Sequence, residues 1–60
     1  MQTVTDLALA HGWTDETVAE LERHLKNKNM AAALSLVRAQ DMSDPDRQHL
    51  MALIVLAIVS

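Results

Sequence analysis

Residue types that perform catalysis are few in this chain. No cysteine is present, so a nucleophile would have to be a hydroxyl side chain such as Ser35 or Ser43. A catalytic serine needs a histidine to take its proton and an acid to orient that histidine. The histidines, His11, His24 and His49, fall in separate segments, and no spacing joins one of them to a serine and an acid. We therefore expect no catalytic residues and no enzymatic activity.

Pairs of metal-binding residue types occur twice at helical spacing. Glu20 and His24 are separated by four positions, and Asp46 and His49 by three. Each pair would share one face of a helix. A zinc site needs three or four ligands, however, and cysteine ligands are excluded here. We expect these pairs to be solvated polar residues, and we predict no metal and no cofactor.

A group of carboxylates follows the only tryptophan. Asp15, Glu16, Glu20 and Glu22 lie close together in the sequence, and the whole chain has a net charge of −3. An acidic chain gains little of the phosphate attraction that supports binding to nucleic acid. The carboxylates are either an ordinary solvated helix face or an acidic surface that binds a basic protein.

The elements that position these residues are predicted to be helices. Half of the 60 residues are apolar, and Phe and Tyr are absent. The apolar residues are Ala, Leu, Val, Ile and Met with a single Trp, and the chain has one Gly and one Pro, a mixture that favours helix over strand. We predict a single all-α domain over residues 1–60. Its four helices are expected over 4–10, between the cap Thr14 and the polar stop 26–29, over 30–39, and from Ser43 or Asp44 to the end.

Capping signals define these boundaries. Thr3 and Asp6 have the spacing of a capping box, and Gly12 can supply the positive φ that ends the first helix. The third helix is expected to begin after the cap Asn29. Pro45 suits the first turn of the fourth helix. Two apolar stripes follow from the spacing: Val18, Leu21 and Leu25 on the second helix, and Met30, Leu34 and Val37 on the third.

The fourth helix is apolar in every direction around its axis. Residues 50–59 are ten consecutive apolar side chains, and a helix that is hydrophobic all round is normally buried all round. Three short helices of a 60-residue chain are not expected to enclose it, and association with a second copy is the simplest remedy. We predict an intertwined or side-by-side homodimer, and the alternative is a monomer in which the fourth helix is central. The predicted interface residues are Leu50, Leu53, Ile54, Leu56, Ala57 and Ile58.

The apolar run is half the length of a membrane-spanning helix, which needs about 20 residues. The polar residues Arg47, Gln48 and His49 precede it directly, so a buried or interface helix is the better interpretation. A peripheral membrane role for the run is a third possibility. The N-terminus lacks the basic and apolar regions of a secretory signal, and the absence of cysteine fits a reducing compartment. We expect a cytoplasmic protein.

The first two predicted helices resemble the helix-turn-helix unit of DNA-binding proteins. Over residues 4–23, that family keeps a small residue, a turn glycine and buried apolar residues at positions that here are Leu7, Ala8, Gly12, Trp13, Val18 and Leu21. The resemblance implies a DNA-binding regulator as an alternative function. Its recognition helix would carry the four carboxylates toward the phosphates, which is the wrong sign. A basic surface formed on dimerisation would use Arg23, Lys26, Lys28 and Arg38.

Residues 7–37 also look like a ubiquitin-associated three-helix unit. In that family a glycine and an aromatic residue form the turn after the first helix, and an Asn-x-Asn-apolar sequence opens the third helix, as 27–30 does here. Such domains bind partner proteins through this turn and the third helix. Carried over, the resemblance implies that Gly12, Trp13, Leu36 and Val37 contact a partner.

Taken together, these features predict a non-catalytic, dimeric adaptor, inhibitor or co-chaperone that binds and modulates another protein. We expect its source to be a phage, a plasmid or a secretion system. The predicted partner-binding residues are Gly12, Trp13, Asp15, Glu16, Glu20, Leu36 and Val37.

Overall fold

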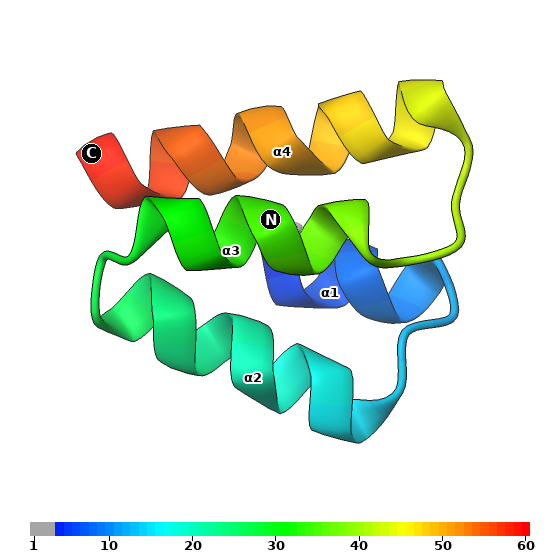
Figure 1. The fold of residues 1–60 in the computed structure, drawn as a ribbon, viewed down its shortest axis with the longest axis horizontal. Coiled ribbons are helices and arrows are strands. Elements are labelled where there is room, and N and C mark those ends of the chain that lie inside the picture. The colour runs from blue at the N-terminus through cyan, green and yellow to red at the C-terminus, as the bar shows by residue number, and fades with distance from the viewer. Residues whose placement is uncertain (1–3) are drawn as a thin grey trace.

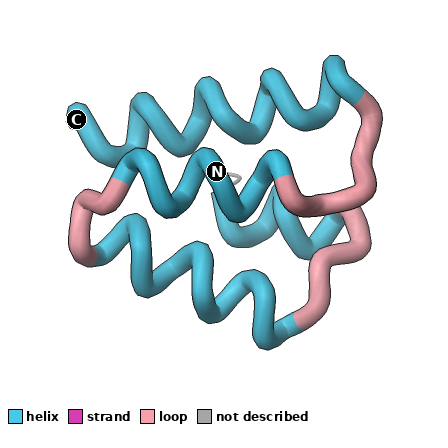
Figure 2. Tube along the Cα trace, in the orientation of Figure 1, coloured by secondary structure: helices cyan, strands magenta, loops and turns pink. Residues whose placement is uncertain are grey.

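The computed structural model describes residues 4–60, and within them every regular element is a helix (Figures 1 and 2). This confirms the predicted all-α class. The predicted capping box at Thr3 lies outside the described residues. The four helices are α1 (Val4–Ala10), α2 (Asp15–Lys26), α3 (Met30–Arg38) and α4 (Asp44–Val59).

Side-chain caps begin α2, α3 and α4 at the predicted residues. The Thr17 amide donates to Thr14 Oγ1 at 3.2 Å, and the Ala32 amide donates to Asn29 Oδ1, also at 3.2 Å. Ser43, rather than Asp44, caps α4 and accepts from the Asp46 amide at 3.3 Å. Each cap satisfies one of the amides that a first helical turn leaves unpaired.

Two turns place a residue in the left-handed region. Gly12, which follows α1, has φ +87°, as its position after the first helix predicts. Lys28, between α2 and α3, has φ +55°. A side chain in that conformation is uncommon, and nothing in the sequence identified Lys28 as the residue that adopts it.

The helices α2 and α4 lie on opposite sides of the molecule, at the bottom and top of Figure 1. Both α1 and α3 contact each of them. The described chain measures 24 × 24 × 22 Å along its principal axes, so the 16 residues of α4, about 24 Å long at 1.5 Å per residue, span the whole molecule.

Each helix contributes one narrow stripe to a single core. On α3 this stripe is Ala33 and Val37, both fully buried, while Met30 and Leu34 are half-buried at its edge. The centre of the buried side of α3 is therefore Ala33 and Val37, one position before Leu34, and the predicted stripe through Met30 and Leu34 forms the edge of that side. The buried residues are Ala8, Trp13, Val18, Leu21, Ala33, Val37, Leu50 and Ile54.

Candidate functional site

The side of α4 that faces the other helices belongs to the core of the single chain. Leu50 and Ile54, one turn apart, have no exposed surface. Met51 and Ile58 are partly buried and pack against the same core. This side of α4 therefore has its full complement of neighbours within one copy of the protein.

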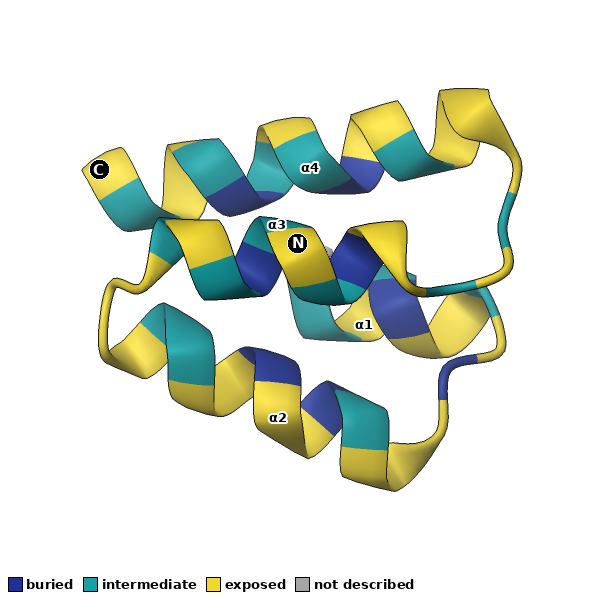
Figure 3. Ribbon diagram, in the orientation of Figure 1, coloured by how far each residue is buried: buried dark blue, intermediate teal, exposed yellow. Residues whose placement is uncertain are grey.

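The opposite side of α4 is apolar and exposed. Leu56 keeps 60% of its surface accessible and Val59 keeps 67%. Ala52, one turn before Leu56, is also exposed. Figure 3 shows this alternation of buried and exposed residues along α4. We call this surface the outer face of α4 and define it as Ala52, Leu53, Val55, Leu56 and Val59.

No charged side chain interrupts this surface, because the last charged residue of the chain is Arg47. The residues of the outer face are thus all of types found in protein cores, but no other helix in the described part of the chain covers them fully. Exposed apolar side chains scattered singly are normal, whereas a contiguous set is typical of an interaction site.

The predicted dimer residues divide between the two sides of α4. Leu53, Leu56, Ala57 and Ile58 are exposed or half-buried. Leu50 and Ile54 are enclosed by their own chain, which corrects their assignment to an interface. A helix that is apolar all round can turn any side inward, and the packing of α1, α2 and α3 selected this one. Ala52, Val55 and Val59 of the outer face were absent from the predicted interface residues, although Ala52, Leu56 and Val59 have a spacing that places them on one helix face.

No family model, curated protein or solved structure matches this chain.

The partner-binding surface predicted at the turn after α1 and on α3 is only partly accessible. Trp13 is only 8% exposed and Val37 is fully buried, so both belong to the core, which corrects their assignment to partner binding. Trp13 is the only large aromatic residue in the chain, and its burial supplies area that no other side chain can. Leu36 is half-buried, and Gly12 is exposed.

The acidic residues of α2 remain available. Asp15, Glu16 and Glu20 are exposed, and an open, shallow depression on this helix is lined by Glu16, Thr17, Ala19, Glu20 and Arg23. Inside it, Arg23 Nη2 lies 3.7 Å from Glu20 Oε1. The outward surface of α2 is thus polar and solvated.

The basic residues do not gather on one surface of the single chain. Arg23 is paired with Glu20. Lys26 ends α2 and Lys28 follows it, next to the start of α3, whereas Arg38 lies at the far end of α3. The alternative of DNA binding would need dimerisation to bring such residues together.

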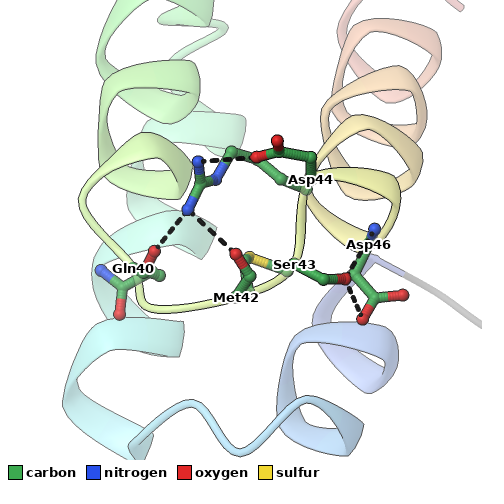
Figure 4. Close-up of polar contacts among 6 residues, drawn as sticks. Gln40, Met42, Ser43, Asp44 and Asp46 are labelled. Atoms are coloured by element: carbon green, nitrogen blue, oxygen red, sulfur yellow. Dashed lines mark hydrogen bonds and ion pairs between the residues drawn. The ribbon is translucent and has the colours of Figure 1, made fainter.

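A serine, an aspartate and a histidine meet at the start of α4, a grouping that spacing did not predict. Ser43 Oγ donates to Asp46 Oδ2 at 2.8 Å (Figure 4). His11 Nδ1 lies 3.9 Å from the same carboxylate oxygen. The carboxylate stands between serine and histidine, whereas nucleophilic catalysis needs the histidine in the middle. The grouping therefore caps α4 and does not activate Ser43.

Arg47 connects α4 to the loop that precedes it. One terminal nitrogen donates to the carbonyl oxygens of Gln40 and Met42, at 2.9 and 3.2 Å (Figure 4). The other lies 3.6 Å from Asp44 Oδ1. This half-buried guanidinium connects the first turn of α4 to the loop between α3 and α4. The sequence suggested no such role for it.

Within residues 4–60, no three metal-binding side chains converge on a common point. The same region contains no helix that is both long and apolar enough to cross a membrane. The exposed apolar side chains on α4, Leu56 and Val59 with their neighbours, are not needed by the core of the single chain.

Proposed function

We propose that this protein is a non-catalytic protein–protein interaction module that associates with a second copy of itself through the outer face of α4. The observation that carries the proposal is the exposure of Leu56 and Val59 on a surface without charge. Full burial of a Leu or Val contributes about 1.5–3 kcal/mol. A covering chain would therefore recover about 1–2 kcal/mol at each of these two side chains.

A second copy is the occupant that the charge distribution favours. Two copies of an acidic protein repel each other wherever their acidic surfaces meet. Here α2, the helix with the exposed carboxylates, lies on the side of the molecule opposite α4 (Figure 1). Contact through α4 joins two uncharged surfaces and keeps the acidic surfaces apart. One patch then serves both copies, as a twofold dimer requires.

The association is expected to be weak. A standard interface buries about 800 Å² on each partner, which is about a fifth of the 3975 Å² surface of this chain. A contact restricted to α4 and its flanks is smaller than that. We therefore expect a dissociation constant of about 1–100 µM.

The test compares the mass in solution of three proteins over a range of concentrations. The unaltered chain should approach twice its 6.6 kDa as the concentration rises. Leu56→Glu places a charge on the outer face and should stay monomeric. Ala19→Glu is the matched control, because it adds the same charge at an exposed position of α2 and should dimerise normally.

Circular dichroism should show equal helix content in all three proteins, since both substituted positions are exposed. Ile54 is unsuitable for this test because a charge there would disrupt the core. An unaltered chain that remains monomeric up to about 1 mM, or a Leu56→Glu variant that dimerises as well as the control, would contradict the proposal.

Binding of a different protein is the second part of the proposed function. Its support is the exposed acidic surface of α2, which dimerisation leaves free on both copies. A basic partner surface is its expected complement. Replacing Glu16 and Glu20 by Lys should abolish capture of the host partner while leaving the dimer intact, and capture that is unaffected by this charge reversal would argue against α2 as the binding surface.

A further inference from the structure

Four exposed residues on the outer side of α4 form a seam with coiled-coil spacing. His49, Ala52, Leu56 and Val59 are separated by three, four and three positions. This is the alternation of the two inward positions in a heptad repeat. A seam of this kind packs against another helix at an angle of about +20°.

We propose that the second copy docks with its α4 antiparallel to the first, so that Ala52 of each copy packs against Leu56 of the other. This inference rests on the proposed self-association and specifies its geometry. The twofold axis then passes between the helices at the level of residue 54. His49 of each copy lies opposite Val59 of the other.

Side-chain volume favours the antiparallel arrangement. In a parallel pair, Ala52 would face Ala52 and Leu56 would face Leu56, so that a small layer would be followed directly by a large one. Interaxial distances range from about 8 to 10 Å according to the side chains at the contact. A parallel pair cannot satisfy both layers without a void at Ala52. In the antiparallel pair, both central layers match one small residue with one large residue.

Polar residues favour it as well. A parallel pair would enclose His49 against His49 within the seam, whereas the antiparallel pair places each His49 at an end of the interface, where its ring can reach water. The flanking residues of the seam do not oppose either orientation, since Leu53 and Val55 are both apolar and half-buried.

The charges at the start of α4 supply an independent argument. Asp44 and Asp46 lie in its first turn, with side chains 88% and 51% exposed. A parallel pair would bring these two carboxylates of each copy together at one end. With the axis at residue 54, an antiparallel pair separates the two Asp46 residues by about 24 Å along the helix axis and the two Asp44 residues by about 30 Å. Both distances are well beyond the screening length of about 8 Å at physiological ionic strength. The antiparallel pair also sets the two helix dipoles in the favourable opposed orientation.

The absence of cysteine from the chain permits a clean cross-linking test. A disulfide needs Cα atoms within about 7 Å. In the antiparallel dimer, residue 49 of one copy lies opposite residue 59 of the other. Two residues 59 are separated along the axis by about 15 Å, at 1.5 Å per residue. A parallel dimer reverses both relations.

The experiment uses three single-cysteine variants of the full chain, His49→Cys, Val59→Cys and Ala19→Cys. They are oxidised separately and as a mixture of the first two, one of which carries a tag that changes its mass. The expected result is a mixed His49→Cys and Val59→Cys cross-link, formed severalfold faster than any self-link. Ala19→Cys lies on α2 and reports the rate of random collision.

Each outcome has a distinct meaning. Preferential mixed links support the antiparallel dimer. Self-links of Val59→Cys that outpace the mixed link overturn the orientation but leave self-association standing. Rates no faster than those of Ala19→Cys, together with a monomeric mass for the unaltered chain, overturn both the orientation and the proposed function.

Discussion

The helices α2 and α4 make the same contribution to the fold and opposite contributions to the surface. Inward, α2 buries Val18 and Leu21, and α4 buries Leu50 and Ile54. Outward, α2 presents carboxylates around Glu16 and Glu20, whereas α4 presents Leu56 and Val59. A core requires only one apolar stripe from each helix. The second apolar side of α4 is therefore not needed by the core, and the proposed self-association rests on it.

The inner sides of the two helices should be equally important for stability. Leu21→Ala and Ile54→Ala each remove a fully buried side chain and should each cost about 2–5 kcal/mol of unfolding free energy. Urea denaturation monitored by circular dichroism at one protein concentration measures this cost. The control is Leu56→Ala, measured at a dilution where no dimer forms. An Ile54→Ala cost no larger than that of Leu56→Ala would show that the two sides of α4 do not differ.

The starts of the two helices should respond equally to loss of their caps. Thr14→Ala and Ser43→Ala each remove one side-chain oxygen that accepts from a first-turn amide, at an expected cost of about 1 kcal/mol. Thr14→Ser and Ser43→Thr retain the acceptor and should behave nearly as the unaltered protein does. Thermal unfolding is the measurement. A Ser43→Ala variant that unfolds at the same temperature as the unaltered protein would show that the Ser43 cap does not stabilise α4.

The outer side of α2 should contribute least to stability and to association. Glu20→Gln breaks the exposed ion pair with Arg23 and should change the unfolding free energy by less than about 0.5 kcal/mol, because water and salt screen such pairs. Association should also be unaffected, in contrast to Leu56→Glu on α4. Loss of the dimer in Glu20→Gln would show that the interface lies on α2 and not on α4, contrary to the proposal.

Local signals predicted the helices well because each depends on residues within one turn of the boundary. Thr14, Asn29 and Ser43 cap helices as expected, and Gly12 adopts the positive φ that its position requires. Lys28 escaped prediction because the left-handed position that ends α2 is usually filled by glycine or asparagine. Here the Asn29 amide donates to the His24 carbonyl and the Lys28 amide to the Leu25 carbonyl, so that Lys28 takes this position. The pairing of His11 with Asp46 escaped prediction because 35 positions separate them in the sequence.

From the sequence alone, the count and continuity of apolar residues in 50–59 established that α4 carries more hydrophobic surface than one helix of a small domain needs to bury. Only the tertiary structure decided which side is surplus. An evenly apolar helix has no preferred direction of its own, so the choice was made by the shapes of the surfaces packed against it. That packing drew Leu50 and Ile54 inward, together with Trp13 and Val37, and left Leu56 and Val59 outside.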